Sequence, residues 1–347
     1  AAQKLAGLIE SPTGAPKEAA AVFAVAVELH RANRCPVPDL FEKGKAVAAR
    51  IAPADGAAAL AVLETVAPFA PDPGAELDFR TTLLEKLQAA APADPDAATR
   101  LAAAYEARGL VDKCEKLLAP FEKTLGDRDG AAILGRIHLA RGRADKAHAL
   151  LAPYVAARLP ALQSAQESYP AQMQAAHGRV MGELRGGKAA GFDYAAYDRA
   201  GKDVQAAMVD DYVTARMQAD ATFQAAQKAL AAQRPVIGAV LDLGVLQLQR
   251  GQALADPAAR AAELQAAEKT FLSVRAVAGE SDAYRLSLGQ VYHWLGRPAD
   301  GKKQFDELIA ARGNTPDAML MVATAVREVG DHGGARQLAE RAYSAAA

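Results

Sequence analysis

The stretch LGQVYHWLGRPADGKKQF, residues 288–305, decides the fold. Each of its two predicted helices carries a small residue and an aromatic residue, and a glycine lies between the helices: Leu288-Gly289 and Tyr292, then Gly296, then Gly301 and Phe305. Counting 34 residues forward from Gly296 reaches Gly330, and counting 34 back from Phe305 reaches Phe271. A period near 34 with small residues on both helices predicts stacked pairs of α-helices.

The same spacing recurs upstream in two further segments. One contains Leu134-Gly135, Gly142, Ala147 and Leu151, and a weaker one contains Leu101-Ala102, Tyr105, Gly109, Cys114 and Leu118. Around these units we expect four regions: irregular helix pairs at 1–94, repeats at 95–159, an atypical long helical hairpin at 160–232 and repeats at 233–347. Together they predict an all-α chain, folded as one continuous right-handed solenoid of about eight helix pairs.

Composition favours helix throughout the chain. Hydrophobic residues make up 51% of the sequence but aromatic residues only 5%, and alanine accounts for roughly a quarter, well above ordinary usage. Alanine is the strongest helix former, and its small side chain lets helices pack closely. The chain is therefore expected to bury many thin interfaces between neighbouring helices rather than one thick core.

Charge and cysteine content argue against several classes of function. The chain has 40 Lys and Arg against 41 Asp and Glu, a net charge of −1, which gives little electrostatic reason to bind nucleic acid or an anionic membrane. Its two cysteines, Cys35 and Cys114, lack the spacing of a metal site. Cys114 occupies a small-residue position of the repeat and is expected in the core, and no disulfide framework is expected.

No membrane insertion is expected either. The longest apolar run, residues 19–27, is shorter than the roughly 18–20 residues that span a bilayer. The sequence starts without a Met or a basic-apolar leader and reads as a piece of a longer protein, so a targeting signal would lie outside it. The compartment and the oligomeric state stay unknown from the sequence, with the cytoplasm slightly favoured.

Local signals place helix boundaries in the first half of the chain. Pro36 and Pro38 are expected to break the first helix. Further helices are expected at 40–51, at 56–66 after an N-capping Asp55, and at 76–91.

Signals in the second half are less regular. Tyr169-Pro170 is expected to open a helix that runs to residue 184, and 202–233 has no internal breaker. The helix pair that contains Gly244 is longer than the regular repeat. Its extra residues are expected in a loop insertion at 254–257. Two regular units are expected to follow at 282–313 and 316–345, the latter with Pro316 in its first turn.

In these residues the chain resembles the tetratricopeptide repeat family. That family has a Leu-Gly pair and an aromatic residue on the first helix of each unit, and a small residue and an aromatic residue on the second. About five units match, at 95–158 and 235–345. The resemblance implies a non-catalytic scaffold that holds a peptide or helical segment of a partner protein on a concave face lined by first helices. The corresponding outward positions here hold Glu106, Arg136, Gln290, His293, Trp294 and Arg327.

One subset of the family grips a C-terminal carboxylate with Lys and Asn on successive first helices. The matching positions in this chain hold Thr99 and Ala103, then Ala132 and Arg136. Recognition of chaperone tails is therefore not expected.

Signatures of catalysis and of ligand binding are not found. The segment GELRGGK, residues 182–188, has the outline of a phosphate-binding loop, but it follows a predicted helix, and Ala189 stands where a hydroxyl residue is required. The six histidines contain no i, i+4 pair of a helical zinc site. His138 falls at an aromatic position of the repeat and is expected in the core. The sequence thus predicts no active site, no cofactor and no metal.

Trp294, the sole tryptophan, has two interpretations: packing against the following unit, or an anchor for a partner, since Trp and Arg dominate interface energetics. If Trp294 is an anchor, Trp294→Ala would cost at least roughly 2 kcal/mol of binding free energy. Arg327→Ala would cost less. Two other functions stay open: an accessory or regulatory domain of a larger enzyme, and a structural solenoid that self-assembles.

Overall fold

The computed structural model describes residues 7–9, 12, 14–32 and 39–346, and every regular element among them is a helix. The all-α prediction is confirmed for this part of the chain. Contacts divide the protein into two compact units, residues 1–137 and 138–347. The division falls within α8 (Asp129–Ala140) and coincides with none of the region boundaries predicted after residues 94, 159 and 232.

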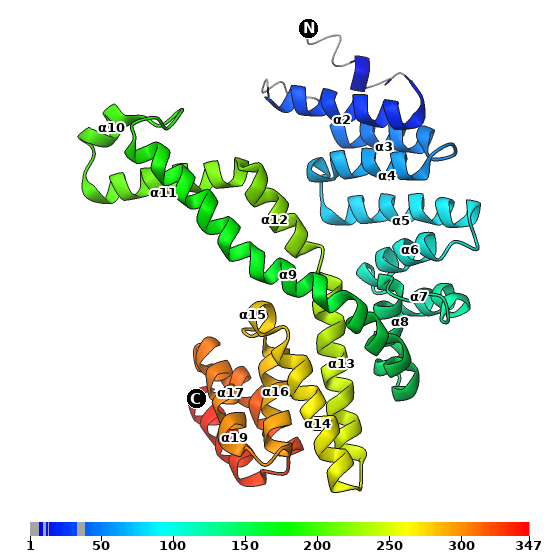
Figure 1. Cartoon of the computed structure of the whole chain (residues 1–347), viewed down its shortest axis with the longest axis vertical. Coiled ribbons are helices and arrows are strands. Elements are labelled where there is room, and N and C mark those ends of the chain that lie inside the picture. The colour runs from blue at the N-terminus through cyan, green and yellow to red at the C-terminus, as the bar shows by residue number, and fades with distance from the viewer. Residues whose placement is uncertain (1–6, 10–11, 13, 33–38, 347) are drawn as a thin grey trace. The chain divides into compact units, whose positions relative to one another are not determined.

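The first unit is a series of helices that follow one another in chain order (Figure 1). They are α2 (Pro16–Ala32), α3 (Leu40–Ile51), α4 (Gly56–Val66), α5 (Pro73–Ala90), α6 (Pro95–Ala107), α7 (Val111–Leu118) and most of α8, with short 3-10 turns η1 (Ala67–Phe69) and η2 (Ala119–Phe121). α3 packs against α4, and α6 packs against both α5 and α7. A side-chain carbon on Gly44 would lie 2.5 Å from Cγ1 of Val66, so the glycine lets α3 and α4 touch.

The second unit has two parts. Helices α9 (Ala144–Arg185), α11 (Lys202–Ala219) and α12 (Ala221–Ala231) pack on one another and form an arm, with α10 (Tyr194–Arg199) at its far end in Figure 1. The remaining helices pack as successive pairs, α13 with α14, α16 with α17 and α18 with α19. Their bounds are α13 (Arg234–Ala253), α14 (Pro257–Leu272), α15 (Arg275–Ala278), α16 (Asp282–Trp294), α17 (Pro298–Ala311), α18 (Pro316–Glu328) and α19 (His332–Ala346).

Several local predictions are confirmed. α3 begins and ends at residues 40 and 51, and Asp55 caps α4 by accepting a 2.9 Å hydrogen bond from the Ala58 amide. Thr315 caps α18, and Pro316 lies in its first turn. Cys114 and His138 are buried, with 1% and 2% of their surface exposed. Pro36, Pro38 and Cys35 lie outside the described residues.

The predicted helix start at Tyr169-Pro170 is wrong. α9 runs unbroken from Ala144 to Arg185 and contains Pro153, Pro160 and Pro170, so the predicted region boundary at 159/160 lies inside one helix. A proline inside a helix removes one hydrogen bond and costs about 3 kcal/mol. Packing of α9 against α12 and α13 offsets that cost and keeps the helix continuous.

Two further boundaries differ from expectation. The unbroken stretch 202–233 is two helices, because Asp220 adopts an extended conformation and caps α12 with a 2.9 Å hydrogen bond from the Phe223 amide. The extra residues of the Gly244 pair do not form a loop. Compared with the pair α16 and α17, they lengthen the end of α13, which ends at Ala253, and, to a greater extent, the start of α14, and only three residues separate the two helices. α13 and α14 are in close contact, as predicted from the small residue at 244, because a side-chain carbon on Gly244 would lie 2.6 Å from Cζ of Phe271.

One segment of the described chain, residues 221–253, is long and apolar enough to cross a membrane by length and composition. It consists of α12 and α13, two separate helices. Val236, Ala239 and Val240 of α13 are fully buried, and α13 packs against α9, α14 and α16. Of the apolar 18-residue window in this segment, 33% is buried inside the structure.

Candidate functional site

The end of α16, where three of the predicted site residues lie, is fixed by a close contact with α17. A side-chain carbon on Gly289 would lie 2.5 Å from Cε1 of Phe305, and one on Gly301 would lie 2.6 Å from the Gly289 carbonyl oxygen. Both glycines are buried, so any larger residue would force the helices apart. The Leu-Gly pair that defines the repeat thus determines where Gln290, His293 and Trp294 project.

Gln290 is engaged within the protein. Its amide nitrogen donates a 2.7 Å hydrogen bond to Oε2 of Glu328 and lies 3.5 Å from the Ala325 carbonyl oxygen. Both partners are on α18, so this side chain links the first helices of two successive pairs. A partner that used Gln290 would have to replace these bonds.

Trp294 is the last residue of α16 and is only partly exposed. Its indole Nε1 is buried and has no hydrogen-bond partner. The ring is therefore packed against the protein, which favours the packing interpretation, but an unpaired buried donor is costly by about 1–3 kcal/mol.

His293 opens onto a hollow of about 340 Å³ that we term the α17–α19 hollow. Its floor consists of the buried side chains Phe305 and Ile309 of α17 and Val322 and Val326 of α18. They belong to the apolar core of the last two pairs. The hollow lies in the size range of small-ligand pockets and exposes core surface where one further apolar side chain could be covered.

Charged groups of both signs surround this hollow. Lys302 and Asp306 form a 2.5 Å ion pair along α17. Asp331, which caps α19 by accepting a 2.8 Å hydrogen bond from the Gly334 amide, and Arg341 complete the rim. An apolar floor inside a polar rim is the usual anatomy of a protein-binding surface.

Arg327 does not share this hollow. It is exposed and lines a different surface hollow of about 400 Å³, formed by α18 and α19. The predicted residues of the second unit therefore have different surroundings: Gln290 is bonded to α18, and His293 and Arg327 line different hollows.

Glu106 and Arg136, the predicted residues of the first unit, are brought together. Nη1 of Arg136 on α8 donates a 2.7 Å hydrogen bond to Oε1 of Glu106 on α6. Both side chains are partly exposed, so this ion pair is worth about 1 kcal/mol or less. A partner would meet a neutralised pair here rather than two separate charges.

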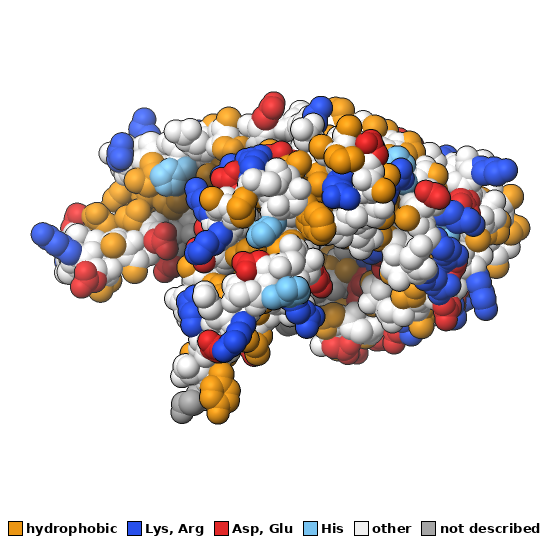
Figure 2. Space-filling model, turned by 90° about the horizontal axis from the view of Figure 1, so that it is seen from below, with side chains coloured by type: hydrophobic (Ala, Val, Ile, Leu, Met, Phe, Trp, Pro, Cys, Tyr) orange, Lys and Arg blue, Asp and Glu red, His pale blue; other side chains and the backbone are white. Residues whose placement is uncertain are grey.

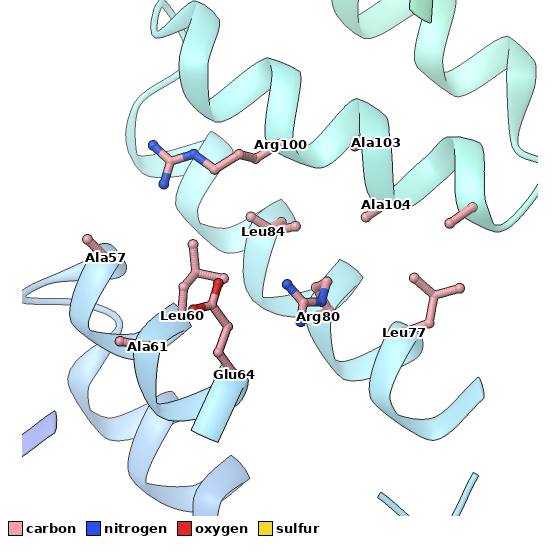
Figure 3. A pocket seen from close by; sticks show the side chains of 11 residues that line it. Ala57, Leu60, Ala61, Glu64, Leu77, Arg80, Leu84, Arg100, Ala103 and Ala104 are labelled. Carbon is pink, nitrogen blue, oxygen red and sulfur yellow. The ribbon is translucent and has the colours of Figure 1, made fainter. Parts of the chain in front are cut away.

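A hollow in the first unit was missed by sequence reasoning. It encloses about 480 Å³ between α4, α5 and α6. Figure 3 shows Leu60 and Glu64 from α4, Arg80 and Leu84 from α5, and Ala103 from α6 around it. Arg80 is already paired with Glu76 at 2.6 Å. Alanines on α4 and α6 leave the space open.

Burial is the largest cause of the raised pKa values of two groups in the first unit, Cys114 and Tyr105. Burial raises the pKa of the Cys114 thiol to about 11, and the thiol donates a hydrogen bond to the Ala102 carbonyl. Burial also raises the pKa of Tyr105 to about 12, helped by its 2.8 Å hydrogen bond to Glu85. Cys114 is thus held as an unreactive thiol, since thiolates are the nucleophilic form.

Surface charge is mixed. Figure 2 shows Lys and Arg side chains interspersed with Asp and Glu side chains over the face it presents. Within the described part of the chain, no group of three or more His, Cys, Asp or Glu residues is arranged to hold a metal ion.

No protein-family model matches this chain. A search of curated proteins also finds no significant match to it.

Proposed function

We propose that the protein is a non-catalytic scaffold, a right-handed solenoid of tetratricopeptide-like helix pairs, that binds a peptide or helical segment of a partner protein. The close helix contacts at Gly244, Gly289 and Gly301 support the repeat, because they occur at the small-residue positions of the sequence pattern. Folds of this kind bury little within each pair and offer long surfaces to partners.

The observation that carries the proposal is the α17–α19 hollow. Its four floor residues are large and apolar, and they already belong to the core of the last two pairs. One apolar side chain inserted over this floor would gain about 1.5–3 kcal/mol from burial. His293, predicted from the sequence as a partner contact, lies at the edge of the same hollow.

The rim defines the partner chemistry. Lys302, Asp306, Asp331 and Arg341 carry two positive and two negative charges. We infer that the partner segment is amphipathic, with one large apolar anchor flanked by charged residues of both signs. Charged residues at the rim contribute to specificity and association rate more than to affinity.

The test uses Ala299, an exposed residue of α17 that lines the hollow. Peptides are selected from a displayed random library on the wild-type chain, and their affinity is then measured by fluorescence polarisation for two variants. Ala299→Trp fills the hollow and leaves the residues of the core unchanged. Ala310→Trp makes the same change at an exposed position of α17 that does not line it.

We expect Ala299→Trp to weaken binding by about tenfold or more, and Ala310→Trp to leave it within about twofold, as for loss of one anchor pocket. Equal affinity of both variants would place the binding surface elsewhere. Failure of the selection to yield any peptide would count against a peptide-binding function.

A further inference from the structure

A smaller hollow in the last helices has a different chemical character from those described above. It encloses about 140 Å³ beside the end of α14 and is lined by α15, α16 and α17. Most of the residues that line it are polar: Arg275 from α15, Tyr284 and Tyr292 from α16, Arg297 directly before α17, and Asp300, Lys303 and Gln304 from α17. We term it the Tyr284 hollow.

Tyr284 is the unusual member of this set. Only 2% of the residue is exposed, and its ring is held edge-on against Phe271, with the ring centroids 6.1 Å apart. Its hydroxyl oxygen is buried without a hydrogen-bond partner. The buried Tyr105 hydroxyl, by contrast, bonds to Glu85 at 2.8 Å. An unpaired buried hydroxyl is costly, so Tyr284 is a fixed donor that lacks an acceptor.

The cations around the hollow fall into two groups. Arg297 is committed: it bonds to Glu268 and to Asp300 at 2.8 Å each, and its guanidinium lies 4.5 Å from the Tyr292 ring centroid. The carboxylates of Glu268 and Asp300 are thereby occupied. Arg275 and Lys303 form no ion pair with any carboxylate in the described part of the chain. Two uncompensated positive charges therefore border the hollow.

The positive charge of Arg275 affects the pKa values of both tyrosine hydroxyls. Burial raises the pKa of Tyr284 to about 12, and the nearby Arg275 charge opposes that rise. The pKa of Tyr292 is also raised by burial, and Arg275 again opposes the rise. At neutral pH the Tyr284 hydroxyl is therefore protonated and able to donate, close to a positive charge.

We propose that the Tyr284 hollow binds a phosphate group. The donors would be the Tyr284 hydroxyl, the Arg275 guanidinium and the Lys303 ammonium, which come from three different helices. Three donors on three different helices suit the four oxygens of a tetrahedral anion better than the two oxygens of a planar carboxylate, and charge-assisted hydrogen bonds of this kind are strong. The volume admits one such group. This site does not depend on the proposed peptide-binding function.

The experiment measures binding of inorganic phosphate to the full chain by ³¹P NMR line broadening, at fixed ionic strength and without any peptide. Tyr284→Phe, Arg275→Gln and Lys303→Gln are each expected to weaken phosphate binding by about tenfold, the loss of one charge-assisted hydrogen bond. Lys302→Gln is the matched control. It removes the same charge from the neighbouring residue of α17, which lines the other hollow, and is expected to change binding by less than about twofold.

Competition identifies the form of the ligand. Displacement by sulfate but not by acetate supports a tetrahedral-anion site, and binding of methyl phosphate as tight as that of inorganic phosphate would indicate a phosphate ester. Displacement by acetate as effective as that by sulfate would overturn the assignment to phosphate. Broadening that is absent, or equally weakened by Lys302→Gln and Lys303→Gln, would overturn the site itself. Circular dichroism of each variant confirms that it is folded.

Discussion

The ring of Phe305 packs directly against the backbone of Gly289: a side-chain carbon on Gly289 would lie 2.5 Å from Cε1 of that ring. The two residues lie on consecutive helices of one pair, and Phe305 also forms part of the floor of the α17–α19 hollow. The residues that bring α16 and α17 into contact therefore also shape the surface to which we assign function.

Replacement of Gly289 by Ala should reduce the free energy of unfolding by about 1–3 kcal/mol, the scale of core overpacking. The matched control is Gly178→Ala in α9, where an added carbon meets nothing within 4 Å. That change should raise the free energy of unfolding by up to about 1 kcal/mol, because alanine is the better helix former. Urea unfolding of both variants checks the pair, and equal stabilities would contradict the helix contact.

Sequence spacing was sufficient to predict this contact, because small and aromatic residues recur at fixed positions such as Gly244 and Phe271. It was not sufficient for α9, where Pro170 reads as a helix start yet tertiary packing keeps one helix continuous. The surroundings of the expected site residues depend on contacts that the sequence pattern does not show. His293 reaches a hollow, but Gln290 is held by Glu328, a contact between pairs that no local pattern encodes.

The hollows could not be predicted from the repeat for a related reason. A hollow forms where side chains from three or four helices fail to fill a volume, as at Ala103 in the first unit. Periodicity shows which face of a helix is apolar, but it does not sum side-chain volumes across helices that are distant in sequence.

Alkaline unfolding should depend on Tyr284. Its pKa is raised from 10.0 to about 12 in the folded protein, so the folded state favours the protonated hydroxyl. That contribution is fully present below pH 10 and is lost as the pH rises through 12. At pH 11 the loss is on the order of 1 kcal/mol.

Tyr284→Phe should therefore lose less stability than wild type between pH 8 and pH 11, measured by urea unfolding at both values. Tyr105 has a similarly raised pKa and is present in both proteins, so its contribution to the pH dependence of stability is the same in both. An identical pH dependence in the two proteins would show that Tyr284 titrates normally.

The Cys114 thiol should resist modification in the folded protein. Its pKa of about 11 leaves little thiolate at pH 8, and only 1% of the residue is exposed. In a Cys35→Ser background, the reaction with Ellman's reagent at pH 8 should be at least about a hundredfold slower in buffer than in denaturant. Rapid labelling in buffer would mean that α6 and α7 open readily.

Substitutions at two of the predicted partner contacts, His293 and Arg327, should have different effects on the affinity for a selected peptide. His293→Ala should weaken binding by about 1 kcal/mol, because this residue borders the α17–α19 hollow. Arg327→Ala should have little effect, because Arg327 lines a different hollow. If Arg327→Ala proved the more damaging change, the binding surface would be the exposed face of α18 and α19.

The most direct test of the scaffold proposal is methyl NMR of the full chain during titration with a selected peptide. We expect the largest chemical-shift changes at Ile309, Val322 and Val326, the aliphatic floor of the α17–α19 hollow, with methyl groups of the first unit unaffected. Saturable binding with no shift at these three residues would contradict the account.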